Sequence, residues 1–152
     1  MTFREYAATL ERELGVEIQI EDDACAFSYG AKKNFKIEIL IHGSNEHGKL
    51  LTCADIGEPP PLGRERLYRT LLEANDFLGD TAGSTISLNP GNGHARLQRF
   101  DDMDALVAAG PAKALVAFAN TAAAWKMLIA DFRDAPPEDT GAMSAPTGAL
   151  RV

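Results

Sequence analysis

The sequence predicts an α+β fold in which one twisted antiparallel sheet is packed by three helices, in the order α-β-β-β-α-β-β-α. Apolar residues recur with helical spacing in three separated stretches, residues 2–14, 64–78 and 111–132. Between these stretches lie segments in which apolar and polar residues alternate, and short polar turns join them. Strands joined in this way pair antiparallel, so a doubly wound or barrel-shaped parallel sheet is excluded.

The first helix is predicted from its start signal and its apolar stripe. Thr2 and Glu5 have the Thr-x-x-Glu spacing of a capping box, in which each residue satisfies a free amide of the other. Gly15 is a natural stop for this helix. After it, residues 16–20 alternate between aliphatic and polar side chains, which predicts an extended strand. The apolar stripe of the helix consists of Phe3, Tyr6, Ala7, Leu10 and Leu14.

Three strands of a meander are predicted next, over residues 24–29, 35–41 and 49–56. The middle strand is the clearest, because every second residue from Phe35 to Ile41 is aromatic or aliphatic. Short polar turns separate the three strands. A meander of this kind usually buries one face and leaves the other in contact with water.

Three consecutive prolines at 59–61 separate the meander from a second helix, because proline fits neither a helix interior nor a central strand. This helix is predicted over residues 64–78. Its apolar face is broad, since Tyr68, Leu72 and Phe77 widen a stripe of leucines and alanine. A helix with such a broad apolar face needs cover on more than one side.

The C-terminal half is predicted to hold a hairpin and a third helix. Residues 84–88 and 94–100 read as two strands, joined by an Asn- and Gly-rich linker that tolerates positive φ. A short turn follows around residues 103–110. Pro111 begins the third helix, which runs to about residue 132.

Composition limits the classes of protein that the chain can belong to. Its 152 residues suit one domain, expected over residues 1–133, with a flexible tail over residues 134–152, where Pro and Gly recur without a periodic apolar face. A net charge of -7 argues against nucleic acid and anionic lipid as partners. No apolar run approaches the roughly 20 residues of a membrane span, and the charged N-terminus lacks a signal-peptide core. We therefore expect a cytoplasmic protein with no nucleic-acid or membrane partner.

Groups that could carry catalysis or bind metal do not cluster in the sequence. The two cysteines, Cys25 and Cys53, lie in predicted strands without a Cys-x-x-Cys pair, which favours reduced, partly buried thiols. The three histidines lie in or beside predicted turns, and the Asp-Asp pairs lie at element junctions, where Asp is common. We expect no metal, no cofactor and no enzymatic activity, and binding is favoured over catalysis.

Several stretches of the chain, taken together, resemble the CesT (Tir chaperone) family of type III secretion chaperones. The most telling is residues 71–88, LLEANDFLGDTAGSTISL, with the hairpin strand HARLQRF at 94–100 and FANTA at 118–122 before Trp125. The resemblance covers about residues 1–132. It implies a cytoplasmic homodimer that uses no ATP and holds the N-terminal region of a secreted effector as an extended chain, ready for export. The ATPase of the secretion apparatus is a further candidate partner.

Two sets of site residues are predicted. The resemblance implies a dimer interface around the second helix, and the surplus apolar surface of that helix supports it. The first helix, together with an edge strand at 16–20 or 24–29, is expected to bind the effector by apolar anchors and strand addition. The dimer set is Leu67, Tyr68, Leu71, Leu72, Asn75 and Leu78. The effector-binding set is Phe3, Tyr6, Leu10, Leu14, Ile18 and Phe27.

Alternatives remain open from the sequence. Phe3 and Leu10 can instead simply close the core of the domain. At the level of function, the runner-up is a small-molecule sensor or regulatory α+β domain in which an apolar helix covers a pocket. A small enzyme is a third, less favoured hypothesis.

Overall fold

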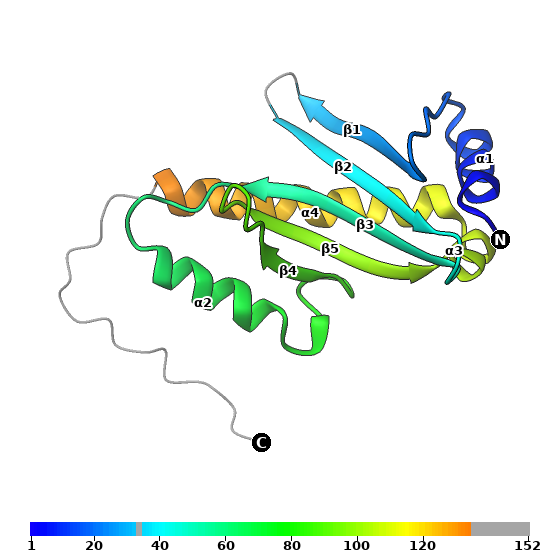
Figure 1. Ribbon diagram of the computed structural model, residues 1–152. Helices are drawn as coiled ribbons and strands as arrows, with labels where there is room; N and C mark the ends of the chain where they lie inside the picture. Colours follow the sequence, from blue (N-terminus) through cyan, green and yellow to red (C-terminus); the bar gives the residue numbers. More distant parts are fainter. Residues whose placement is uncertain (33–34, 135–152) are drawn as a thin grey trace.

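Five strands form one antiparallel sheet in the order β1-β2-β3-β5-β4 in the computed structural model, which describes residues 1–32 and 35–134 (Figure 1). The strands are β1 (Ala24–Lys32), β2 (Phe35–Ser44), β3 (Lys49–Gly57), β4 (Thr85–Leu88) and β5 (Ala95–Asp102). The helices are α1 (Phe3–Leu14), α2 (Arg64–Ala74), α3 (Met103–Ala109) and α4 (Pro111–Asp134), with a 3-10 turn, η1 (Asp76–Leu78), after α2.

The helices lie against one face of the sheet and leave the other face open. In Figure 1, α4 passes behind the strands, and it packs mainly on β3 and also on β2. Ile37, Ile39 and Ile41 of β2 are buried on this side, while the residues between them are exposed. This alternation is the one predicted for a meander with one dry face. The core is completed by Leu50 and Ile56 of β3 and by the buried stripe of α4.

The helix α1 is docked on the end of β2. Its N-terminus forms the predicted capping box, since the Thr2 hydroxyl accepts from the Glu5 amide and the Glu5 carboxylate accepts from the Thr2 amide at 2.7 Å. The Phe3 ring lies directly on Gly43, where a Cβ would come within 2.4 Å of the ring. Only a residue without a side chain permits this close approach.

The long helix α4 qualifies the prediction that no apolar segment is long enough to span a membrane. Over its 24 residues it is long and apolar enough to cross a membrane, by length and composition alone. The core helix of a soluble protein passes the same test, and here one side of α4 is buried against the sheet through Leu115, Phe118, Ala122 and Ile129.

The structure corrects two predicted elements. Residues 16–20 do not form a strand; a tight turn at Asp22 and Asp23, both with positive φ, pairs only Glu21 with Ala24. Where a turn is predicted after β5, the helix α3 forms instead, because the Asp102 side chain accepts from the Ala105 amide and caps it. Asp134 ends α4, and the rest of the predicted tail, residues 135–152, lies outside the described residues.

The second helix also ends earlier than predicted. It stops at Ala74, and the chain then turns through Phe77 and Leu78, whose φ values are 53° and 54°. Left-handed backbone is unusual for large side chains, and two such residues in succession mark a constrained segment. This segment leads into β4 and shapes one end of the molecule.

Candidate protein-binding surfaces

The six predicted effector contacts fall into two groups. Phe3, Tyr6 and Leu10 are buried, because α1 turns its apolar stripe onto its own sheet. They close the core, as the alternative derived from the sequence allows, and a partner cannot reach them while α1 stays docked. The other three, Leu14, Ile18 and Phe27, are half-buried and border the core at the β1 side of the sheet.

The outer edge of β1 offers unpaired backbone groups. The outer groups of Ala24 are bonded to Glu21, at 2.8 and 3.0 Å. Because inward and outward residues alternate along an antiparallel strand, the N–H and C=O groups of Ala26 and Ser28 point outward as well. Within residues 1–32 and 35–134, no hydrogen bond beyond the ladders reaches these groups. We call the outward groups of Ala26 and Ser28 the β1 edge.

The β1 edge ends at an irregularity. The pairing of β1 with β2 shifts register between Tyr29 and Lys32. At Gly30 a Cβ would lie 2.5 Å from the Phe35 carbonyl oxygen, so the two backbones approach more closely than other residues allow. Half-buried apolar side chains lie on β1 itself, at Phe27, and on the chain that leads into β1, at Leu14, Ile18 and Ile20.

A second surface lies at the opposite end of the sheet, along α2, η1 and β4. Five of the eleven exposed large hydrophobic side chains in the described part of the chain fall here. Phe77 is 96% exposed and Leu72 is 70% exposed. Exposed apolar side chains gathered in one region are suited to contact with another protein. We call it the α2–β4 surface, and it consists of Leu62, Leu72, Phe77, Leu78 and Leu88.

The predicted dimer residues divide between this surface and the core. Leu67 and Leu71 lie on the buried side of α2, and Tyr68 of the same helix is half-buried. Leu72 and Leu78 are exposed and belong to the α2–β4 surface. Asn75 has a different role, because its side chain is bonded to the backbone of Ile86 in β4. Helical spacing could not show this, since the contact joins residues eleven positions apart.

The loop that carries Phe77 is fixed from several sides. The Leu78 carbonyl accepts from the Gly83 amide at 2.9 Å and from the Thr81 hydroxyl at 3.2 Å. The indole N–H of Trp125 in α4 donates to the Asp80 carbonyl at 3.1 Å. These hydrogen bonds fix the backbone of the loop, and the loop keeps the Phe77 side chain exposed. The sequence offers only a weak signal of this, a large aromatic residue shortly before Gly79.

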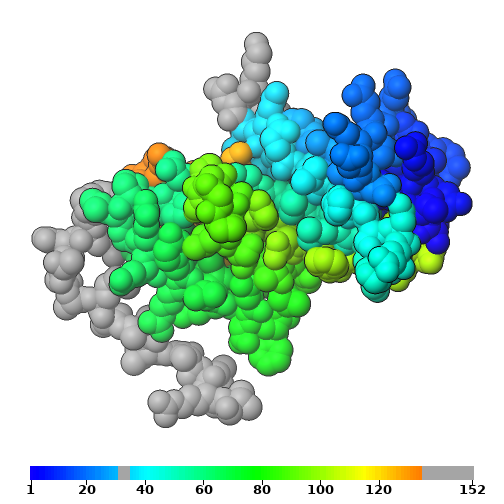
Figure 2. Space-filling model, in the orientation of Figure 1, coloured from blue at the N-terminus to red at the C-terminus, as the bar shows by residue number. Residues whose placement is uncertain are grey.

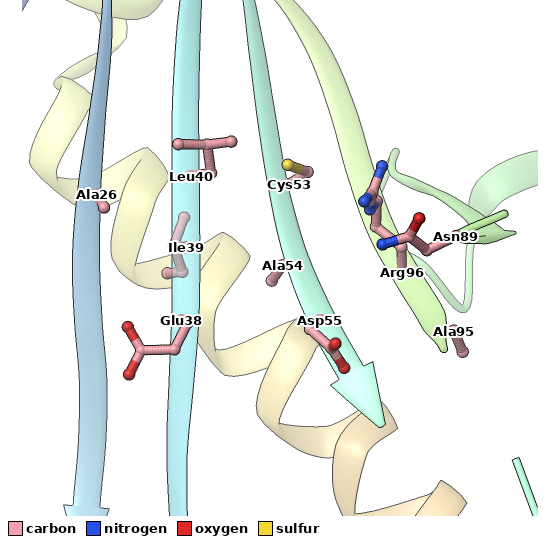
Figure 3. Close-up of a pocket in the computed structure, with 10 residues that line it drawn as sticks. All are labelled: Ala26, Glu38, Ile39, Leu40, Cys53, Ala54, Asp55, Asn89, Ala95 and Arg96. Atoms are coloured by element: carbon pink, nitrogen blue, oxygen red, sulfur yellow. The ribbon is translucent and has the colours of Figure 1, made fainter. Parts of the chain in front are cut away.

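The open face of the sheet is the side seen in Figure 2, with α1 and α2 at opposite ends of the molecule. A shallow hollow of about 220 Å³ lies on it, lined by Leu40, Cys53 and Ala26 and bordered by Asp55 and Arg96 (Figure 3). A second hollow is bordered by an ion pair between Arg133 and Glu58 and by a hydrogen bond between His94 Nδ1 and the Asp55 carboxylate, each at 2.7 Å. Both hollows open to solvent. The small-molecule sensor, which needs a covered pocket, gains no support from them.

The thiols do not provide reactive chemistry. Burial raises the pKa of Cys25 to about 11 and also raises the pKa of Cys53, so both remain protonated at neutral pH. Among the described residues no group of His, Cys, Asp and Glu is arranged to hold a metal ion. The geometry thus consists of surfaces suited to binding other chains.

Comparison with known families decides the class. The model of the Tir chaperone protein (CesT) family matches residues 6–126, which is most of the chain. The chain belongs to the CesT family. This confirms the predicted family, and a CesT chaperone is not an enzyme, as predicted. No curated protein matches the chain.

Solved structures show the same fold as this CesT chain. A chain of the ExsC–ExsE complex aligns with a TM-score of 0.65 at 15% identity, over 85% of this chain and 97% of that one. A chain of the HopA1–SchA chaperone–effector complex aligns with a TM-score of 0.58 at 14% identity, over 84% and 91%. A chain of the heterodimeric ExoU–SpcU complex from the type III secretion system of Pseudomonas aeruginosa aligns with a TM-score of 0.56 at 16% identity, over 84% and 96%. The predicted α+β fold is confirmed.

Proposed function

We propose that this CesT chain is a cytoplasmic, homodimeric type III secretion chaperone that binds the N-terminal region of a secreted effector as an extended chain. The bound segment adds a strand at the β1 edge and stays export-competent because it is kept from folding. The observation that carries this proposal is the β1 edge itself, with the outward groups of Ala26 and Ser28 unpaired. Family membership and the fold of solved chaperone–effector complexes support it.

Strand addition alone does not supply enough binding free energy. A main-chain hydrogen bond contributes about 0.5–1.5 kcal/mol net, and ordering a disordered segment costs about 2–5 kcal/mol or more. Apolar anchors must therefore contribute as well. Leu14, Ile18 and Phe27 lie at the β1 side of the sheet, half-buried, where such anchors could pack. Of the six residues predicted to bind the effector, these three remain in the proposal.

The homodimer is assigned to the α2–β4 surface. Leu72 and Phe77 would be shielded from water by a second copy, and a two-fold contact repeats the same surface on both protomers. A stable interface needs about 800 Å² from each partner, so the contact would extend beyond the exposed apolar side chains themselves. Because β1 and β4 are the two outer strands of the sheet, this arrangement leaves both β1 edges free for effector.

Replacing Ala26 with Pro tests the effector site. Its N–H points away from β2, so Ala26→Pro removes an outward donor without removing a bond of the ladder. We expect binding to weaken at least about tenfold, equivalent to about 1.4 kcal/mol. The measurement is calorimetric titration with peptides covering the N-terminal region of an effector encoded beside the chaperone gene.

Ala26→Val is the matched control, because it retains the N–H, and it should bind as the unmodified protein does. Melting temperatures of both variants establish that the sheet is intact. Full-strength binding by a folded Ala26→Pro variant would rule out the β1 edge as the effector site.

A further inference from the structure

We propose that Asn75 closes the β4 edge against strand addition, so that each protomer can accept an extended chain at one edge only. The proposal rests on the proposed function, since it concerns which edge receives the effector. It also implies that the homodimer forms by packing of side chains and not by joining two sheets.

The Asn75 amide occupies the position that a neighbouring strand would take. Its Nδ2 donates to the Ile86 carbonyl at 3.0 Å, and its Oδ1 accepts from the Ile86 N–H at 2.8 Å. A neighbouring strand would bond a residue through the same donor and acceptor pair. The Asn75 amide carries a donor and an acceptor on one planar group, so it matches both backbone groups of Ile86 at once.

These two Ile86 groups are the outward ones. The Asn89 N–H donates to the His94 carbonyl at 2.8 Å, which closes the β4–β5 hairpin. Backbone groups alternate between inward and outward along an antiparallel strand. Because Asn89 bonds inward, Ser87 and Thr85 also bond inward to β5, and the backbone groups of Ile86 and Leu88 point outward. We call the outward groups of Ile86 and Leu88 the β4 edge. With Ile86 occupied, only Leu88, the last residue of the strand, remains available.

The amide is held in place by the loop that contains it. The Asn75 carbonyl accepts from the Leu78 amide at 3.3 Å, and the Leu78 carbonyl accepts from the Gly83 amide. Trp125 fixes the same loop through Asp80. The Asn75 side chain is therefore prepositioned, and an incoming strand would have to displace two hydrogen bonds before it formed its own.

An open β4 edge would be harmful in this particular place. Unpaired edge strands promote joining of sheets and aggregation, and the neighbouring α2–β4 surface already exposes Leu72 and Phe77. An apolar surface beside a free edge would attract a second extended chain, or the β4 edge of another copy. Asn75 separates the two kinds of contact, because it leaves the apolar surface available and removes the backbone template.

The test compares Asn75→Ala with the unmodified protein in three measurements. Hydrogen exchange at the Ile86 amide should be slow in the unmodified protein and at least about tenfold faster in the variant, a difference of about 1.4 kcal/mol in opening free energy. Titration with the effector peptides should change from one strand per protomer to two. Sedimentation without peptide should show assemblies larger than the dimer.

Thr81→Val is the matched control. It removes the hydroxyl that bonds the Leu78 and Ser84 carbonyls of the same loop, but it leaves the Asn75 amide in place. We expect one strand per protomer and no larger assembly. If Thr81→Val behaves as Asn75→Ala does, loosening of the loop and not loss of the amide explains the change, and the proposal fails.

One further measurement and one further variant distinguish loss of the Asn75 amide from loss of the fold. Fluorescence of Trp125, the single tryptophan, reports whether the loop is intact, and if Asn75→Ala unfolds, Asn75→Asp replaces it. That variant keeps an acceptor for the Ile86 N–H but loses the donor, so intermediate exchange is expected. A folded Asn75→Ala variant with unchanged exchange, stoichiometry and assembly would overturn the proposal. If the unmodified protein binds no strand, the proposed function fails, while exchange and assembly still test Asn75.

Discussion

The two outer strands of the sheet differ in what they offer to another chain. At β1, nine residues long, the outward backbone groups of Ala26 and Ser28 have no partner among residues 1–32 and 35–134, and Phe27 between them is half-buried. At β4, four residues long, the Asn75 amide holds the outward groups of Ile86, and the nearby Phe77 side chain in η1 is almost fully exposed. One edge presents backbone and the other presents side chains. The difference teaches that the two outer edges of one sheet can differ in chemistry, which is what the proposed effector and dimer sites require of them.

The largest effect is expected from charging the α2–β4 surface. Replacing both Leu72 and Phe77 with Asp should dissociate the proposed homodimer, because each apolar anchor buried in an interface contributes about 2 kcal/mol or more. We expect at least about a hundredfold weaker dimerisation, measured by sedimentation at tens of micromolar protein.

Phe100→Asp serves as the control for that prediction. Phe100 is 72% exposed, like Leu72, but lies on β5 outside the α2–β4 surface. Its replacement should leave the dimer intact. A monomeric unmodified protein, or equal loss of dimer in both variants, would remove the assignment of this surface.

A smaller effect is expected where α1 supports the β1 side of the sheet. In Gly43→Ala the new Cβ would meet the Phe3 ring, and overpacking of this kind costs about 1–3 kcal/mol. The melting temperature should fall by several degrees, and dimerisation should be unaffected. Gly79→Ala is the matched control, because nothing lies within 4 Å of its Cβ position. Equal melting temperatures for the two variants would show that the α1 contact is looser than described.

The smallest effect is expected from acid, and it concerns the α1 end of the molecule. The hydrogen bond from the Thr2 amide lowers the pKa of Glu5 below its ordinary 4.5, and the bond from the Ala105 amide lowers the pKa of Asp102 below its ordinary 3.8. Because folding lowers both pKa values, their stabilisation is complete above the ordinary values. It is lost as the pH falls through the lower, folded values.

Melting curves recorded from about pH 6 to about pH 2.5 would check this. The variants Glu5→Gln and Asp102→Asn should each show a shallower decline of melting temperature on the acid side. As the pH is lowered, the α1 amides should lose their protection from hydrogen exchange at a higher pH than the Ile86 amide at the opposite end of the molecule. Identical acid slopes in the variants and the unmodified protein would contradict the assignment of these two caps.

The sequence predicted the elements well but not which side of α1 faced outward. Phe3, Tyr6 and Leu10 have helical spacing whether their stripe meets the chain's own sheet or a partner, so periodicity could not decide between core and binding surface. The close contact of Phe3 with Gly43 depends on residues forty positions apart. The surface role of Phe77 likewise depends on a local left-handed backbone that breaks the predicted helix.

Asn75 shows the same limit for hydrogen bonding. In the sequence it lies on the predicted second helix, among residues expected at the dimer interface. The pairing order of the strands decides its role, because only an outer strand has free groups for its amide to bond. Strand order across a sheet is a long-range property, and a single sequence does not reveal it.

The register shift between Tyr29 and Lys32 sets a length. Beyond Tyr29 the pairing of β1 with β2 is no longer in register, and before Ala26 the outward groups of Ala24 are already bonded to Glu21. An added chain would therefore lie in register with only about four residues, roughly 13 Å at about 3.3 Å per residue. Backbone pairing over so short a stretch does not distinguish one peptide sequence from another. Selectivity between effectors would then come from the spacing of the apolar side chains that an effector carries on either side of this short paired stretch.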